Sequence, residues 1–288
     1  MRRNYADPVV KMGETACSSI AVMMQTEGVS RIDARVLMKT ALKVNDAHIA
    51  AHPERGLSHD ERDRFLEWVQ RRRAGEPIAY ITGRREFYGL AFAVTPAVLI
   101  PRPETELLVD LALERIAPDQ PCTVLDLGTG SGCVAVTIAK QRPCSRITAT
   151  DVSPDAMNVA RENAWRHSAE NIEFVSADWL GALRKASFDI IVTNPPYVAL
   201  GDPHLSQGDL RFEPRVALAG GKDGLDCIRE IAADAHDRLR PGGWLLIEHG
   251  CDQGAPCLGL LRGLGYAEVR DFSDLSGLPR VAAARRPG

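Results

Sequence analysis

The sequence predicts two domains: a small helical bundle, followed by an α/β domain with a doubly wound parallel sheet. Between residues 15 and 82, apolar residues recur at the spacing of amphipathic helices. After residue 122, short apolar runs alternate with helical segments, which is the element order of a parallel sheet covered by helices on both faces. The chain of 288 residues is long enough to build two such cores.

The helical domain is assigned to residues 1–83. Ser30 followed by Asp33 is typical of a capped helix start, and Ser58 with Glu61 forms a second pattern of this kind, a capping box. This domain holds no constellation of catalytic side chains. We therefore expect it to recognise a substrate rather than to carry out chemistry.

Residues 84–100 are predicted to form a β-hairpin that links the two domains. Apolar and polar residues alternate there around Gly89, as they do on either side of a hairpin turn. A helix is predicted at 107–116, and Glu104 or Thr105 is expected to start it.

The α/β domain is assigned to residues 101–288. Apolar, β-branched runs predict strands at 123–127, 146–150, 171–175, 188–193, 243–248, 266–272 and 279–284. The intervening segments predict helices at 134–140, 154–167, 224–239 and 252–263. A long irregular insertion at 198–222 is uncommon in a compact domain unless it binds something.

Composition excludes several classes of protein. No apolar run approaches the roughly 18 residues of a membrane span, and no apolar signal core follows the basic N-terminus. The seven cysteines are odd in number and include no Cys-x-x-Cys pair, which disfavours a disulfide framework and a structural zinc site. We expect a cytoplasmic protein with no metal and no membrane partner.

Charge is unevenly distributed along the chain. Residues 1–85 carry a net charge of +4 and the remainder carries −7. An acidic α/β domain is a poor fit to an enzyme that binds duplex DNA, which usually presents a basic face.

A glycine-rich run at Asp126–Gly132 follows the first predicted strand of the α/β domain. It lets the backbone approach a ligand, and the helix N-terminus behind it favours an anionic group. The residues of this turn are Gly128, Thr129, Gly130, Ser131 and Gly132. A dinucleotide site needs a third glycine where this chain has Cys133, which counts against a nicotinamide cofactor.

Two further residues stand at predicted strand ends. Asp151 is placed to accept hydrogen bonds from ribose hydroxyls, or else to serve as a carboxylate in the helix turn beside Ser153. Trp179 is placed to contact the edge of an adenine ring, or else to pack in the core.

The stretch Asn194-Pro195-Pro196-Tyr197 ends the fourth predicted strand of this domain. Two successive prolines stop the strand because neither can donate to the ladder. The turn offers two acceptors, the Asn194 side-chain oxygen and the Pro195 carbonyl, to a flat –NH2 group of an amide or a base amine. A plain strand end is the competing interpretation, and the glycine-rich turn about 60 residues upstream favours a binding site.

Together these motifs resemble those of class I S-adenosylmethionine-dependent methyltransferases with a Rossmann-like sheet. Further stretches resemble one family among them, the release factor glutamine N5-methyltransferases. These stretches are Gly75–Ile81, Glu86–Gly89, Leu99–Glu106, Arg211–Pro214 and Glu248–Gly250. The resemblance covers nearly the whole chain beyond the first 15 residues or so.

The resemblance implies methyl transfer to the glutamine of the Gly-Gly-Gln motif in class I peptide chain release factors. S-adenosylmethionine would be held by Gly128, Thr129, Gly130, Ser131, Gly132, Asp151, Trp179 and Asn194. Substrate glutamine would be held by Asn194, Pro195, Pro196 and Tyr197, with Asn194 and Pro195 as the catalytic residues. Tyr197 would pack on the amide plane, or else in the core.

Two other functions remain open from the sequence. A DNA or RNA amino-methyltransferase, acting on adenine N6 or guanine N2, shares the Asn-Pro-Pro-Tyr stretch. A non-catalytic adaptor that binds S-adenosylmethionine would not need that stretch. The expectation is a monomer that acts on release factors and contacts no nucleic acid directly.

Overall fold

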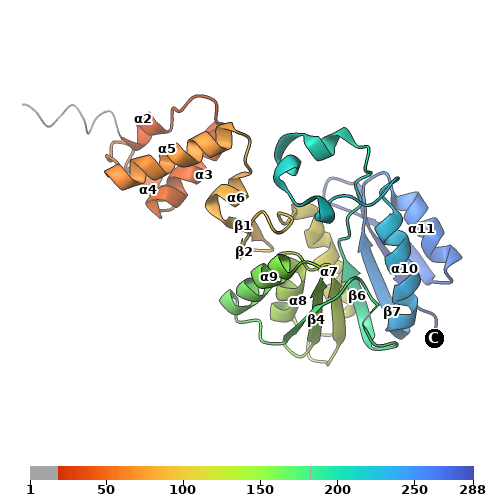
Figure 1. Cartoon of the computed structure of the whole chain (residues 1–288). Helices are drawn as coiled ribbons and strands as arrows, with labels where there is room; N and C mark the ends of the chain where they lie inside the picture. The colour runs from red at the N-terminus through yellow and green to blue at the C-terminus, as the bar shows by residue number, and fades with distance from the viewer. Residues whose placement is uncertain (1–18, 182) are drawn as a thin grey trace, which may run out of the picture. The chain divides into compact units, whose positions relative to one another are not determined.

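The computed structural model describes residues 19–181 and 183–288 (Figure 1). Contacts divide the chain into two compact units, Met1–Thr82 and Gly83–Gly288. Residues 15–18 of the predicted helical segment lie outside the described residues. None of the helices in the described part is both long and apolar enough to cross a membrane.

The first unit is helical, as the sequence predicts. Its described helices are α2 (Ile20–Met23), α3 (Arg31–Leu42), α4 (Asp46–Ala51), α5 (His59–Arg73) and α6 (Ile78–Thr82). The Ser30 side chain caps α3 by accepting a hydrogen bond from the Asp33 backbone, and Ser58 with Glu61 forms the predicted capping box of α5. Phe65 of α5 is fully buried in a core shared with α3.

The second unit begins with the expected hairpin and continues into a seven-stranded sheet. The hairpin strands β1 (Arg84–Phe87) and β2 (Leu90–Ala93) pair antiparallel. The sheet strands are β3 (Thr123–Leu127), β4 (Arg146–Asp151), β5 (Ile172–Ser176), β6 (Phe188–Thr193), β7 (Leu239–Glu248), β8 (Ala267–Ser273) and β9 (Pro279–Arg285). Their order is β5-β4-β3-β6-β7-β9-β8.

Strand direction departs from the prediction at one edge of this sheet. Strands β3 to β7 pair in parallel, but β9 runs antiparallel to both β7 and β8. A parallel sheet was expected, and that expectation is wrong for β9, whereas β8 runs in the same direction as β7. A short turn joins β8 to β9, and so short a connection allows only an antiparallel pair.

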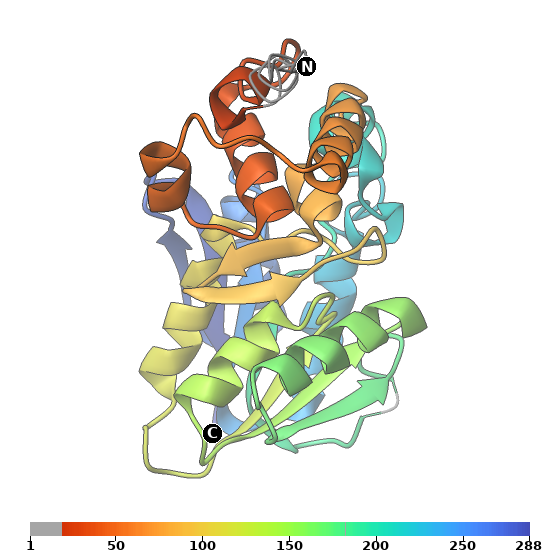
Figure 2. The same ribbon diagram turned by 90° about the vertical axis from the view of Figure 1, so that its left-hand side faces the viewer.

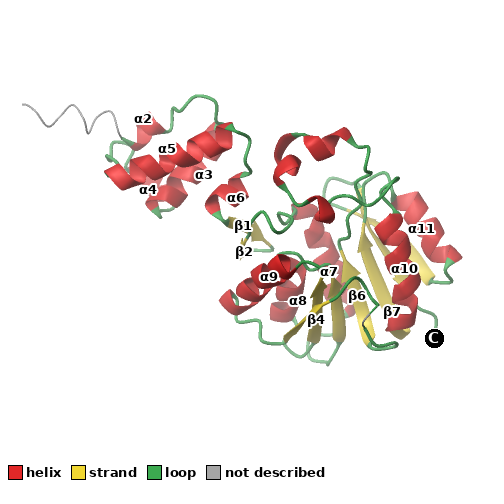
Figure 3. Ribbon diagram, in the orientation of Figure 1, coloured by secondary structure: helices red, strands yellow, loops and turns green. Residues whose placement is uncertain are grey.

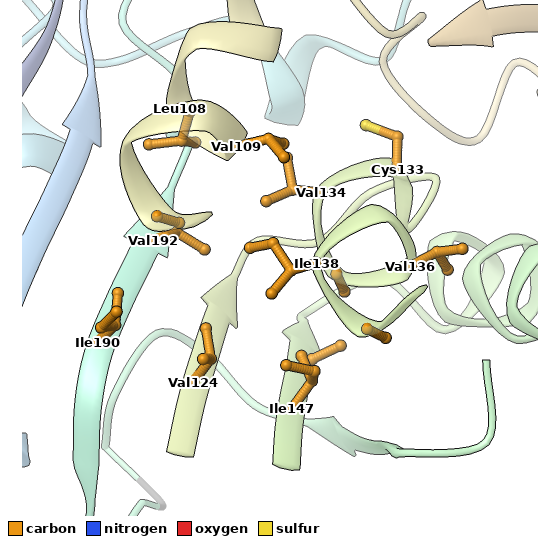
Figure 4. Packing of buried hydrophobic residues seen from close by; sticks show 14 of the residues in the cluster. Leu108, Val109, Val124, Cys133, Val134, Val136, Ile138, Ile147, Ile190 and Val192 are labelled. Atoms are coloured by element: carbon orange, nitrogen blue, oxygen red, sulfur yellow. The ribbon is translucent and has the colours of Figure 1, made fainter. Parts of the chain in front are cut away.

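Helices cover both faces of the sheet (Figures 2 and 3). One face carries α7 (Glu106–Arg115), α8 (Cys133–Gln141) and α9 (Pro154–Arg166), and the other carries α10 (Asp226–Arg238) and α11 (Gly254–Gly263). Alternate residues of one strand face opposite sides of the sheet. Val124 joins the core under α7 and α8 (Figure 4), whereas Leu125 joins the core under α10. The fold is therefore the doubly wound α/β class that the sequence predicts.

The predicted insertion at 198–222 contains three short 3₁₀ helices. These are η2 (Pro203–Ser206), η3 (Gly208–Phe212) and η4 (Arg215–Ala217). A fourth, η1 (Pro103–Thr105), precedes α7. The side chain of Glu213 fixes the insertion to the segment before α7, since it accepts a hydrogen bond from Ile100 N at 3.1 Å and pairs with Arg102.

Candidate active site

A cavity of about 460 Å³ opens at the carboxyl ends of β3, β4 and β6. Parallel strands bring their carboxyl ends to one edge, where doubly wound folds bind ligands. Its volume lies within the range of small-molecule sites. Predicted site residues that line it are Gly128, Thr129, Gly130, Ser131, Asp151, Trp179, Asn194 and Pro196.

The glycine-rich turn forms one wall of this cavity. Gly128 and Gly130 have φ values of 72° and 54°, a left-handed conformation that side chains disfavour. A Cβ added to Gly130 would meet no atom within 4 Å, so ligand can approach this backbone. Gly132 is absent from the cavity wall; a Cβ there would lie 3.1 Å from the Ala160 side chain, which makes it a packing position between α8 and α9.

Asp126 also lines the cavity, although it was not among the predicted ligand residues. Its Oδ2 accepts hydrogen bonds from Thr129 Oγ1 at 2.7 Å and Ala135 N at 3.1 Å, which ties the turn to α8. Burial, with a smaller contribution from the nearby Asp151 carboxylate, raises the pKa of Asp126 to about 6. An acid at the end of a buried strand is the sequence signal that could have identified it.

Asp151 combines the two roles that the sequence left open. Its Oδ1 accepts a hydrogen bond from Ser153 N at 2.9 Å, as a carboxylate in a helix turn does. Its Oδ2 accepts one from Gly130 N, also at 2.9 Å, and the residue lines the cavity. Each oxygen keeps a lone pair for a ligand hydroxyl.

Trp179 lies beside the turn in the wall of the cavity. Its ring would lie 3.5 Å from a Cβ built on Gly128. Its backbone φ is 45°, a conformation uncommon for any non-glycine residue and most so for a bulky one. The strained backbone and the position in the wall together favour a binding role for the ring.

A second cavity, of about 640 Å³, adjoins the first. Asn194, Leu99, Arg102 and Ala217 line both cavities. Pro195 and Tyr197 line only the second, and Pro196 lines only the first. The Asn-Pro-Pro-Tyr stretch therefore separates two spaces that meet at Asn194, the arrangement needed for transfer between two bound molecules.

The Asn194 amide has a defined orientation. Its Nδ2 donates a hydrogen bond to Thr105 Oγ1 at 3.2 Å, so Oδ1 is the end left to accept one from a ligand. Within the described part of the chain the Pro195 carbonyl accepts no backbone hydrogen bond. The structure thus keeps both predicted acceptors available.

Hydrogen bonds with two other side chains hold Tyr197 in place. Its hydroxyl donates to Glu248 Oε1 at 3.4 Å, and its carbonyl accepts a hydrogen bond from Gln253 Nε2 at 3.0 Å. Burial and the neighbouring Glu248 carboxylate raise the pKa of Tyr197 well above its usual range. The ring stays neutral at physiological pH, as suits packing against an uncharged amide.

Stability should depend on pH through Glu248, whose pKa is raised to about 7 mainly by burial. A carboxyl with a raised pKa in the folded chain stabilises the fold in acid, and this contribution is lost as the pH rises from about 4.5 to about 7. Because a glutamine does not titrate, we expect the free energy of unfolding of E248Q to lack this decrease between about pH 4.5 and about pH 7. Denaturant unfolding of both proteins at pH 5 and pH 8 measures it; equal pH dependence in the two would contradict the assignment.

Known proteins are similar to this chain over most of its length. Residues 104–207 match the methyltransferase small domain, and residues 22–83 match the PrmC N-terminal domain. The release factor glutamine methyltransferase of Burkholderia pseudomallei is 45% identical over 278 residues, which are 94% of this chain and 97% of that protein. The chain belongs to the release factor glutamine methyltransferases. The enzyme of this name from Xylella fastidiosa strain Temecula1 is 46% identical over 91% of this chain and 96% of its own length.

A solved structure shares the fold. A methyltransferase from Pyrococcus furiosus aligns with a TM-score of 0.54 and 20% identity, over 77% of this chain and 98% of that one. The chain is a methyltransferase, and S-adenosylmethionine is its methyl donor. The first cavity fits this donor, because the carboxylates of Asp126 and Asp151 suit a cation and the N-terminus of α8 suits a carboxylate.

Proposed function

We propose that this enzyme transfers a methyl group to the side-chain amide nitrogen (N5) of the glutamine in the Gly-Gly-Gln motif of class I peptide chain release factors. The observation that carries the proposal is Asn194, whose free amide oxygen lies where the two cavities meet. The names of the relatives support release factors as the substrates. The Gly-Gly-Gln glutamine follows from the motif resemblance.

The proposed mechanism depends on positioning. When bound, S-adenosylmethionine supplies an electrophilic methyl group on a cationic sulfur. The Asn194 Oδ1 and the Pro195 carbonyl accept the two N–H bonds of the substrate amide, which holds the nitrogen in line with that methyl group. A carboxamide nitrogen is a weak nucleophile because its lone pair is delocalised into the carbonyl. Most of the rate therefore comes from holding the nitrogen in line and from the two hydrogen bonds that polarise its N–H groups. No strong general base is required, because a methylated amide cation loses its proton readily.

In the first cavity, we propose that Gly128 to Ser131 hold the methionine part of the donor. Asp151 accepts the ribose hydroxyls and Trp179 contacts the adenine. Gly132 contributes by allowing α8 to approach α9 rather than by touching the donor.

Methyl incorporation tests the proposal against a nucleic-acid substrate. The enzyme is incubated with labelled donor and with separate pools of release factor, DNA and RNA. We expect label in the release factor alone, abolished when its Gly-Gly-Gln glutamine is replaced. Label in DNA or RNA would favour an amino-methyltransferase of bases, and label in none would favour the adaptor.

We further propose that the helical unit orients the release factor, and that the enzyme works as a cytoplasmic monomer. All residues that line the two cavities belong to the second unit, which has its own cores. Deleting residues 1–83 should therefore leave affinity for S-adenosylmethionine unchanged while KM for the intact release factor rises. The control substrate is a short Gly-Gly-Gln peptide, whose methylation should change less. Full activity of the truncated enzyme on the whole factor would contradict this role.

A further inference from the structure

We propose that Thr105 and Glu248 form a positioning relay that fixes which end of the Asn194 amide faces the substrate. The inference rests on the proposed function, in which the Asn194 oxygen accepts a hydrogen bond from the target amide. It accounts for two sequence stretches without a role so far, the one that contains Thr105 and the one that begins at Glu248.

The three residues come from three separate elements. Thr105 precedes α7 and is 3% exposed, Asn194 follows β6, and Glu248 ends β7 and is fully buried. Asn194 Nδ2 donates to Thr105 Oγ1, and the Thr105 side chain lies beside the Glu248 carboxyl, where it lowers the pKa of Glu248 and so favours the ionised form. The threonine hydroxyl thus lies between the amide and the carboxyl.

Hydrogen-bond polarity gives this connection a direction. A side-chain amide has a donor end and an acceptor end of nearly the same shape, and a hydroxyl can pair with either one. An ionised carboxylate only accepts, so the Thr105 hydrogen is directed to Glu248. The Thr105 oxygen must then accept from Asn194 Nδ2, which leaves Oδ1 for the substrate. Without Glu248, the flipped amide would offer the substrate a donor, which an –NH2 group cannot accept well.

Stability does not explain a carboxyl at this position. Glu248 Oε1 accepts from the Tyr197 hydroxyl, but Oε2 is buried without a hydrogen-bond partner among the described residues. A buried unpaired oxygen is unfavourable, and an apolar side chain of the same size would stabilise the fold more. A role in orienting Asn194 and Tyr197 would explain why a carboxyl group is buried at position 248.

The relay should respond to pH. The groups around Glu248 are Glu104, which raises its pKa, Arg280 and Tyr197, which lower it, and Cys133, which stays a neutral thiol because burial raises its own pKa. The balance, dominated by burial, places the pKa of Glu248 at about 7. Protonated Glu248 can donate to Thr105 and release the constraint on the amide. We therefore expect kcat to fall as the pH decreases through about 7.

Three threonine variants test the relay in single-turnover methyl transfer to a release factor. T105V keeps the shape and removes the hydroxyl, so the single-turnover rate should fall about tenfold or more with the enzyme saturated in S-adenosylmethionine. T105S restores the hydroxyl and should recover most of the rate. T137V removes another buried hydroxyl, whose only hydrogen bond among the described residues is to the Cys133 carbonyl inside α8, and should retain the wild-type rate.

The variant E248Q tests the pH dependence. Its amide does not titrate, so the inflection of kcat near pH 7 should disappear, and its thermal unfolding shows whether it is folded. Wild-type transfer to the release factor is measured first, and its failure would refute the proposed function rather than the relay. Given wild-type transfer, a T105V rate equal to wild type, or an E248Q profile that keeps the inflection, would overturn the relay.

Discussion

N194A should fold and bind S-adenosylmethionine normally but lose most of its methyl transfer. The substitution removes one of the two proposed acceptors for the substrate amide, so the nitrogen can rotate out of line with the methyl group. Loss of an interaction that orients a reacting group costs on the order of 2–4 kcal/mol in the transition state. Single-turnover rates with a release factor, with the enzyme saturated in both substrates, measure the effect.

The control for N194A is N158A, which truncates an exposed asparagine of α9 that lines neither cavity. N194D is a sharper comparison, because it keeps an acceptor of the same size. It also loses the amide donor to Thr105 and adds a charge, so we expect a rate between those of wild type and N194A. Wild-type transfer by N194A would show that this turn does not hold the amide.

Much of the fold was predictable because it depends on local patterns. The parallel strands, the hairpin and the helix caps each follow from short runs, such as the spacing of Ser58 and Glu61. The reversed direction of β9, which lies between β7 and the edge strand β8, was not predicted. Apolar periodicity shows which residues form a strand, whereas direction depends on the neighbour with which the strand pairs.

The site was predictable where its residues belong to one contiguous motif. The turn at Gly128–Ser131 and the stretch at Asn194–Tyr197 meet as expected, because both follow strands of one parallel sheet. Thr105 was considered only as a helix start, although it lies 89 residues from its partner Asn194 in the sequence. Contacts between such distant segments are set by packing, which no local pattern contains.

D151A should weaken the binding of S-adenosylmethionine by roughly 2–3 kcal/mol, about 30- to 150-fold in affinity. The lost carboxylate is the proposed acceptor for the ribose hydroxyls. It also holds the glycine-rich turn, because its two oxygens accept the backbone N–H groups of Gly130 and Ser153. Both losses act on the same cavity wall, so calorimetric titration should show weaker donor binding, while thermal unfolding checks the fold.

Two variants separate the causes of this loss. D151N keeps the shape, but its –NH2 end must face the N–H of either Gly130 or Ser153, where a donor meets a donor. We therefore expect little rescue by D151N. D155N removes an exposed acid in the first turn of α9, away from the cavity wall, and should bind the donor as wild type does. Equal losses in D151N and D155N would indicate a general effect of charge, and unchanged affinity in D151A would refute the ribose assignment.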